Sequence, residues 1–157
     1  MSYENPWTFD GKVFDSEDIG NAYGFVYLIT TPEGKKYIGR KYFWSVRKAK
    51  GKTRRQRSES DWKVYYGSSE VLKEQIKSSD KSQFKREIIS LHSTKGDVNV
   101  TEVRLQFLFN VLENESYVNE NINGKWHRPP NHIIKKRRVS SSYSKLLLSS
   151  SDEPLKE

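Results

Sequence analysis

Two β-prone runs joined by a turn sequence constrain the fold of this chain more than any other feature. Residues 24–30 read Gly-Phe-Val-Tyr-Leu-Ile-Thr, and residues 35–39 read Lys-Lys-Tyr-Ile-Gly. Both runs carry the β-branched and aromatic residues that are typical of strands. Between them, Pro32 suits the second position of a type I turn, and Gly34 suits the left-handed residue that follows it. The sequence therefore predicts a β-hairpin with a three-residue loop.

The length of that loop decides which side chains share a face of the sheet. A three-residue loop pairs Ile29 with Tyr37 and Tyr27 with Gly39. Tyr27 and Tyr37 are then diagonal neighbours on one face, with backbones roughly 7–8 Å apart. A loop of two or four residues places the two tyrosines on opposite faces, because successive residues of a strand alternate.

Further elements are expected on both sides of this hairpin. Asp10-Gly11 is a strong two-residue turn signal, so Trp7 is expected to pair with Phe14 in a small N-terminal hairpin. A third strand is expected at 83–91. Helices are expected at about 69–79, capped by Ser68 or Ser69, and at 97–112, where apolar residues on nearly all sides indicate a buried helix.

These elements predict an α/β fold of the α+β type. We expect a small, mainly antiparallel sheet of three strands flanked by helices, with a basic loop and a mobile C-terminal tail. Residues 1–23 form an N-terminal arm packed on the core, and 24–127 form the main domain. Residues 128–157 are expected to be a disordered tail, because they hold a basic run at 135–138 and seven serines within 140–151.

An excess of basic residues points to a polyanionic partner. The 157-residue chain has 28 Lys and Arg against 20 Asp and Glu, which gives a net charge of +8 and a pI of about 9.5. Such a charge most often indicates nucleic acid. The absence of cysteine excludes disulfides, thiolate catalysis and thiolate zinc sites. No window has the length of a membrane span and no signal peptide is evident, so we expect no membrane partner and a cytoplasmic location.

The basic residues concentrate in one segment, 47–57, which holds seven cations and no acid. Its start suits a helix and its middle a solvated loop. A charge run is usually a solvated surface, but one without interspersed acids also suits contact with duplex phosphates. The candidate DNA-binding residues are Arg40, Lys41, Lys48, Lys50, Lys52, Arg54, Arg55 and Arg57.

An ordered set of motifs resembles the GIY-YIG nuclease superfamily, closest to the phage Seg-type free-standing homing endonucleases. The likeness covers roughly residues 24–124, and its first triplet departs from the family pattern because Gly24 stands one position early. In chain order, the motifs that carry it are Val26-Tyr27, Tyr37-Ile38-Gly39, Tyr66-Gly67-Ser68-Ser69, Phe84-Lys85-Arg86-Glu87-Ile88, Glu102 and Asn119. The resemblance implies that 24–127 is a GIY-YIG-like nuclease domain.

The resemblance also implies roles for individual residues. Tyr27 helps activate the attacking water, and Tyr37 lines the same pocket. Arg47, ten residues after Tyr37, matches the arginine of the helix that follows the second motif, where a guanidinium binds phosphate oxygens. Glu102 corresponds to the metal ligand, and Asn119 to an asparagine beside the phosphate. Arg40 stays open as an alternative to Arg47, as does Asn121 to Asn119.

Glu102 also has a purely local interpretation. The sequence Asn99-Val100-Thr101-Glu102 has the spacing of a capping box, in which a Glu three residues into a helix bonds back to its first turn. The resemblance and the apolar neighbours favour the metal ligand.

The expected chemistry is phosphodiester hydrolysis. It gathers negative charge on phosphate oxygens, which a hard cation such as Mg²⁺ (or Mn²⁺), held by a carboxylate and waters, neutralises. We expect a metal-dependent endonuclease on double-stranded DNA, without a small-molecule cofactor. The resemblance implies a phage homing-type enzyme in a bacterial host's cytoplasm. The alternatives are a non-catalytic nucleic-acid-binding module on the same scaffold, and a metal nuclease that uses His127, Asn131 and His132.

Overall fold

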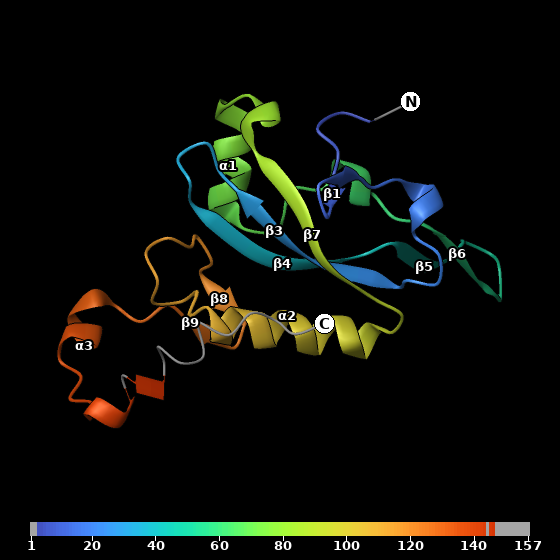
Figure 1. Ribbon diagram of the computed structural model, residues 1–157. Coiled ribbons are helices and arrows are strands. Elements are labelled where there is room, and N and C mark those ends of the chain that lie inside the picture. Colours follow the sequence, from blue (N-terminus) through green and yellow to red (C-terminus); the bar gives the residue numbers. More distant parts are fainter. Residues whose placement is uncertain (1–2, 144, 147–157) are drawn as a thin grey trace.

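The main sheet has five strands, with order β2-β1-β7-β3-β4, and a helix lies on each of its faces (Figure 1). The computed structural model describes residues 3–143 and 145–146. The strands of this sheet are β1 (Thr8–Phe9), β2 (Lys12–Val13), β3 (Gly24–Thr30), β4 (Lys36–Tyr42) and β7 (Lys85–His92). Two further two-stranded sheets pair β5 (Trp44–Lys48) with β6 (Arg55–Glu59), and β8 (Asn121–Ile122) with β9 (Trp126–His127). The helices are α1 (Glu70–Ser78), α2 (Lys95–Leu108) and α3 (Asn131–Lys135), with 3₁₀ turns η1 (Ser16–Asp18), η2 (Trp62–Val64) and η3 (Lys81–Gln83).

The expected three-stranded sheet was wrong in strand number, although the sheet is mainly antiparallel. The N-terminal hairpin forms in the expected register, with the Phe14 N–H donating to the Trp7 carbonyl over 2.9 Å. Its strand β1 also pairs in parallel with β7, Thr8 lying opposite Glu87. The arm thereby extends the sheet, because it satisfies backbone groups that the outer edge of β7 otherwise exposes.

The central hairpin has the register that its loop length predicts. Tyr27 lies opposite Gly39, and Ile29 lies opposite Tyr37. The loop is closed by a bond from the Thr31 N–H to the Lys35 carbonyl, and Gly34 takes a positive φ of 85°. The prediction of a three-residue loop with a left-handed glycine is confirmed.

Alternation along β3 and β4 divides the interior between the two faces of the sheet. One face carries Tyr27 and Tyr37 into an aromatic core that α1 and the N-terminal segment cover. The opposite face carries Val26 and Ile38 into a smaller aliphatic core beneath α2. Figure 1 shows α1 and α2 on opposite sides of the sheet. The tyrosines and α2 therefore lie on different faces.

Helix α2 is buried along one stripe and not all round, which corrects the expectation from its composition. Val98, Glu102 and Leu105 are buried, whereas Val100 is 57% exposed and Phe107 is 50% exposed. The sheet covers one side of the helix, and the other side is largely in solvent, although the Phe107 ring lies 5.4 Å from the Trp126 ring.

The helix boundaries decide the local interpretation of Glu102. Helix α2 begins at Lys95, and the Thr94 hydroxyl caps it by accepting from the Asp97 N–H. Glu102 therefore lies in the middle of the helix, beyond the first turn where a capping box operates. The capping interpretation is wrong. At α1, Ser69 is the N-cap, as one of the two expected alternatives.

The basic segment forms a β-hairpin, which corrects the expectation of a helical start and a long loop. β5 and β6 pair in antiparallel from Trp44 opposite Glu59 to Lys48 opposite Arg55, and only residues 49–54 remain as a loop. The pairing explains the difference, because each strand satisfies the backbone groups of the other while its cations stay in water.

The expected C-terminal tail begins with ordered contacts. The Arg128 guanidinium donates to the carbonyls of Val111, Tyr117 and Asn119, and α3 follows. The part of the tail at 144 and 147–157 lies outside the described residues. Within 3–143 and 145–146, no helix has both the length and the hydropathy to cross a membrane.

The packing around Gly39 generates a prediction. A Cβ at this position lies 2.6 Å from Cζ of Tyr27 and 2.9 Å from Cε1 of Tyr37, both in the core. We expect Gly39→Ala to lower the free energy of unfolding by about 1–3 kcal/mol, the usual cost of overpacking. Gly96→Ala is the matched control, because a Cβ there meets nothing within 4 Å. Since alanine is a better helix former than glycine, we expect this control to raise the free energy of unfolding by about 0.5–1 kcal/mol. Urea unfolding measures both variants. A midpoint for Gly39→Ala equal to that of the wild type contradicts the prediction.

Candidate active site

A cleft of about 870 Å³ opens along the outer edge of β4. It straddles the sheet edge, so side chains from both faces reach it. One wall comes from Tyr37, Tyr65 and Ser68 on the aromatic side, and the opposite wall from α2 with Glu102 and Gln106. The remaining lining residues are Gly39, Arg40, Lys41, Tyr42, Trp44, Ser45, Arg47, Ser58, Glu59, Ser60, Asp61, Asn121 and Asn123.

Polar groups cover much of the outer edge of β4, but none among the described residues bonds to the peptide groups of Arg40. Lys36 bonds through its N–H and carbonyl to the 116–118 segment, and the Ile38 N–H donates to Asn119 Oδ1. Farther along, the Tyr42 carbonyl accepts from the Ser60 hydroxyl. By the alternation of an antiparallel ladder, the peptide groups of Arg40 point to this same edge. The open stretch of the edge lies at the cleft.

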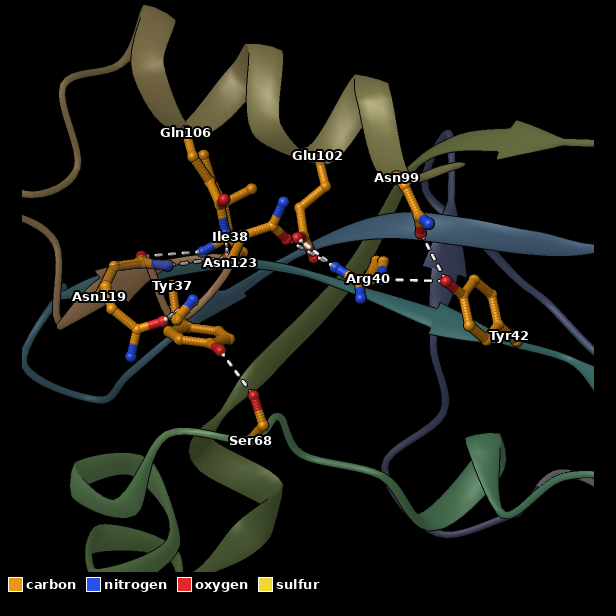
Figure 2. A network of polar contacts seen from close by, with 12 residues as sticks. Tyr37, Ile38, Arg40, Tyr42, Ser68, Asn99, Glu102, Gln106, Asn119 and Asn123 are labelled. Atoms are coloured by element: carbon orange, nitrogen blue, oxygen red, sulfur yellow. Dashed lines mark hydrogen bonds and ion pairs between the residues drawn. The ribbon is translucent and has the colours of Figure 1, made fainter. Parts of the chain in front are cut away.

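The two motif tyrosines lie side by side, as their register predicts. Their ring centroids are 6.1 Å apart. Tyr37 is 8% exposed and lines the cleft, where its hydroxyl is 3.0 Å from that of Ser68 (Figure 2). Tyr27 is 1% exposed and lies outside the cleft lining, with its hydroxyl beneath Gly39.

Burial sets the ionisation of both tyrosines. It holds the pKa of Tyr27 well above its usual value, and Tyr37 and Tyr65 reinforce the shift. Burial also raises the pKa of Tyr37, against the opposing hydrogen bond from Ser68. Because a raised pKa favours the neutral phenol, both hydroxyls stay protonated at neutral pH and act as hydrogen-bonding groups.

Glu102 is the buried carboxylate of the cleft, and Arg40 is its partner. The Arg40 guanidinium donates to Glu102 Oε1 over 2.8 Å, while Glu102 is only 5% exposed (Figure 2). Burial raises the pKa of this carboxyl, and the positive charge of Arg40 opposes the shift. A buried carboxylate with one cationic partner is costly to maintain, which is typical of a functional group.

Oxygen donors dominate the α2 side of the cleft. Gln106 follows Glu102 by four residues, so both side chains project from one face of the helix. Gln106 Nε2 donates to the Ile38 carbonyl over 3.0 Å, while its buried Oε1 has no hydrogen-bond partner among the described residues. A carboxylate beside an unsatisfied amide oxygen fits a hard cation such as Mg²⁺, which binds through one or two carboxylates plus water.

The histidine-based alternative gains no support from the described part of the chain. No group of three or more His, Asp or Glu side chains there is arranged to hold a metal ion. His127 lies on β9 and His132 on α3, and neither lines the cleft. Of the three carboxylates that line the cleft, Glu59 is bonded to Trp62 and Asp61 is paired with Lys41, and Glu102 is the buried one.

The two candidate arginines occupy different places. Arg40 bonds to Glu102, to Tyr42 and to Asn123 Oδ1, the last over 3.4 Å. Arg47 lines the same cleft from β5. The resemblance placed Arg47 in a helix, and this is corrected, because the segment pairs as a strand with β6.

The two candidate asparagines also differ. Asn119 is buried, and its amide spans both peptide groups of Ile38: Oδ1 accepts from the N–H over 3.2 Å and Nδ2 donates to the carbonyl over 2.9 Å. Asn121 lines the cleft and accepts from the Gly124 N–H. Asn119 therefore supports the strand that carries Arg40, and Asn121 is the one of the two with surface on the cleft.

The candidate DNA-binding cations extend from the cleft along the hairpin. Lys41 lines the cleft, paired with Asp61 over 2.5 Å and 4.1 Å above the Tyr65 ring. Arg57 stacks 4.1 Å above the Trp44 ring. Lys48 and Arg55 end the two strands, while the other three, Lys50, Lys52 and Arg54, lie in the connecting loop.

Sequence reasoning missed two groups of this cleft. Gln106 carried a signal, because it follows Glu102 at the spacing that shares a helix face. Ser68 belongs to the motif at 66–69 but was given no role in the site, and only the tertiary contact between its loop and β4 brings Ser68 and Tyr65 to the cleft.

The bonds of Asn119 generate a prediction about its role. Asn119→Ala removes both contacts with Ile38 and leaves a buried N–H unsatisfied, so we expect the free energy of unfolding to fall by about 1–3 kcal/mol. Asn121→Ala, at an exposed position, is the control and is expected to change it little. Urea unfolding measures both. An unchanged value for Asn119→Ala contradicts the structural role.

Comparison with known proteins identifies one family. The family model of the GIY-YIG domain of the endonuclease segE matches residues 7–122, from the N-terminal hairpin to the strand after Asn119. No curated protein matches the chain, and neither does any solved structure. The match spans well over half of the chain, and it includes both tyrosines and Glu102. The chain belongs to the Seg-type GIY-YIG endonuclease family.

Proposed function

We propose that this protein is a metal-dependent endonuclease that hydrolyses phosphodiester bonds of double-stranded DNA in the cleft along β4. One observation carries the proposal: the buried Glu102 carboxylate and the Arg40 guanidinium meet at the open stretch of the sheet edge, in a cleft that Tyr37 also lines. Anion-binding and cation-binding groups thus adjoin in a cleft that solvent reaches, which is the requirement for phosphate chemistry.

Arg40 is the arginine that we assign to the reacting phosphate. Its guanidinium offers a planar set of donors, and its peptide N–H points to the same outer edge. In the free protein, the Glu102 carboxylate holds this guanidinium in the cleft. A phosphate that enters finds these donors already oriented, so little ordering is needed on binding.

Tyr37 is the tyrosine that we assign to the attacking water. Its neutral hydroxyl lines the cleft, and the contact with Ser68 fixes its direction. A neutral phenol orients a water by hydrogen bonding and is a poor proton acceptor. The resemblance also links Tyr27 to the activation of the water. In this structure the Tyr27 ring packs against that of Tyr37, and the Tyr27 hydroxyl lies beneath Gly39, which lines the cleft.

Glu102 and Gln106 are the residues that fit a divalent cation. When bound, Mg²⁺ or Mn²⁺ neutralises charge on the phosphate oxygens. Glu102 would supply the ionic ligand, and Gln106 Oε1, which has no partner among the described residues, would accept from a water bound to the cation. The Seg-type membership supports a phage homing role, in a bacterial host, as part of this proposal.

The first test removes the charge of Glu102. Glu102→Gln keeps the shape of the side chain, and we expect Mg²⁺-dependent plasmid cleavage to fall at least a hundredfold while binding of duplex DNA in EDTA persists. Glu113→Gln is the matched control, because Glu113 also pairs with an arginine, Arg137 over 2.5 Å, but lies outside the cleft. Retained cleavage in Glu102→Gln places the metal ligand elsewhere.

The raised pKa of Glu102 predicts two further effects, one on thermal stability and one on the pH dependence of Mg²⁺ binding. Because folding favours the protonated carboxyl, the ionised form costs stability at neutral pH, so the melting temperature of Glu102→Gln is expected to equal or exceed that of the wild type. Protons compete with the cation for this carboxylate, so the apparent affinity for Mg²⁺ falls as the pH drops through its pKa. Thermal unfolding and Mg²⁺ titrations at several pH values measure both effects.

The second test removes hydroxyls. We expect Tyr37→Phe to lower the single-turnover cleavage rate by about 10²-fold, the scale of one positioned hydrogen-bonding group, with the melting temperature nearly unchanged. Tyr117→Phe, outside the cleft, is the control. Tyr27→Phe is compared in the same assay, and a loss as large as that of Tyr37→Phe assigns both hydroxyls to the reacting centre. A wild-type rate in Tyr37→Phe contradicts its assignment.

The alternative function is a non-catalytic module that binds nucleic acid on the same scaffold. Such a module has no need to keep Glu102 buried and paired at a cost in stability. Cleavage of plasmid with Mg²⁺ but not with EDTA separates the two functions. Binding without cleavage under both conditions favours the module.

A further inference from the structure

The two faces of the β5–β6 hairpin differ in chemistry. Directly paired residues share a face of a two-stranded ribbon, and successive residues alternate. One face therefore carries the pairs Ser45–Ser58 and Arg47–Gln56, while the other carries Val46–Arg57 and Lys48–Arg55. The first face is rich in neutral groups that both donate and accept hydrogen bonds, and the second is rich in cations.

The base of the hairpin is fixed to the core, and the rest projects from it. The Trp44 indole donates to the Ala22 carbonyl over 3.2 Å. Across the ribbon, Glu59 accepts from the Ser16 hydroxyl over 2.6 Å and from the Trp62 indole over 2.7 Å. The outer pairs are exposed, and Figure 1 shows the ribbon extending beyond the main sheet. A rigid base holds the projecting part at a defined angle.

The polar face of the ribbon borders the candidate active site. Ser45, Arg47 and Ser58 line the same cleft as Glu102, and from the other face only the pair at the base, Trp44 and Glu59, reaches it among the described residues. Gln56 continues this face outward, because it lies opposite Arg47. A duplex whose phosphate occupies the cleft therefore meets the polar face next.

We propose that the β5–β6 hairpin enters the major groove beside the phosphate in the cleft, where its polar face contacts base edges and Gln56 recognises adenine. This inference rests on the proposed function for its duplex substrate. The B-form major groove, about 12 Å wide, admits a two-stranded ribbon. A glutamine amide pairs with N6 and N7 of adenine, and serine hydroxyls bond to several base edges. Gln56 is thus a residue that determines specificity.

The cationic face fits the phosphates on the flank of the groove. Lys48, Arg55 and Arg57 carry the charge there, and their contacts position the duplex without selecting its sequence. The single acid of the two strands, Glu59, is bonded at the base and leaves the outer part purely basic. Duplex RNA is excluded from this mode, because its deep and narrow major groove does not admit the ribbon.

The test compares neighbours on opposite faces of one strand. Full-length wild type, Gln56→Ala and Arg55→Ala each select duplexes from a DNA library with randomised positions, in EDTA so that binding alone is measured. We expect the wild type to prefer adenine at one position, and Gln56→Ala to lose that preference by about fivefold to a hundredfold. Arg55→Ala keeps the preference but flattens the log–log salt dependence by about 0.9.

The outcomes separate this inference from the proposed nuclease function. An unchanged preference in Gln56→Ala, or a wild type without any sequence preference, overturns the assignment of Gln56 even when plasmid is cleaved with Mg²⁺. A preference that Gln56→Ala abolishes supports the assignment even when no variant cleaves, and the nuclease function then fails alone. Gln56 and Arg55 are both exposed, so neither substitution threatens the fold.

Discussion

Strand β4 pairs with a neighbouring strand on one side only, and the candidate active site depends on this constraint. An unpaired sheet edge exposes backbone groups, and proteins normally cover it. Here the cover is interrupted at Arg40, between the partners of Ile38 and Tyr42. The gap lets groups from both faces of the sheet meet in one cleft. Glu102 from beneath the sheet and Tyr37 from above it reach the same space.

Two arginines serve opposite purposes in this arrangement. Arg86 is 1% exposed and lies 4.7 Å from the Trp7 ring and 4.2 Å from the Tyr66 ring. It also donates to the carbonyls of Asn5 and Tyr65, so it ties the N-terminal arm to the loop behind the tyrosines. Arg40 instead meets Glu102 with part of its guanidinium in solvent. The first contact fixes the aromatic wall, and the second stays accessible to a ligand.

The protein separates two tasks between a rigid core and a projecting ribbon. The cleft groups come from elements that are packed on both faces of one sheet, which holds them in place. The β5–β6 hairpin shares its base with this core and extends cationic and polar faces into solvent. Chemistry and sequence recognition in this proposal therefore involve different side chains.

The sequence by itself determined the local geometry. The Pro32–Gly34 loop is closed within a few residues, so its length alone set the register that places Tyr27 and Tyr37 together. The N-terminal turn at Asp10-Gly11 and the cap at Ser69 are local for the same reason. The order of motifs was enough to indicate the family and to single out Glu102.

Only the tertiary structure decided which distant groups meet. Asn119 and Asn121 are the same residue type two positions apart. Asn119 is buried and bonds to the backbone of Ile38, whereas Asn121 lines the cleft. The spacing of the motifs allows either Arg40 or Arg47. Helix α2 packs on the sheet so that Glu102 lies next to Arg40, and of the two arginines only Arg40 pairs with it. The basic segment at 47–57 is part of a two-stranded ribbon, because backbone groups of β5 and β6 pair across the hairpin. Net charge does not predict this pairing. Long-range packing and backbone pairing decided which asparagine, which arginine and which secondary structure are found, because residue type and spacing do not distinguish these alternatives.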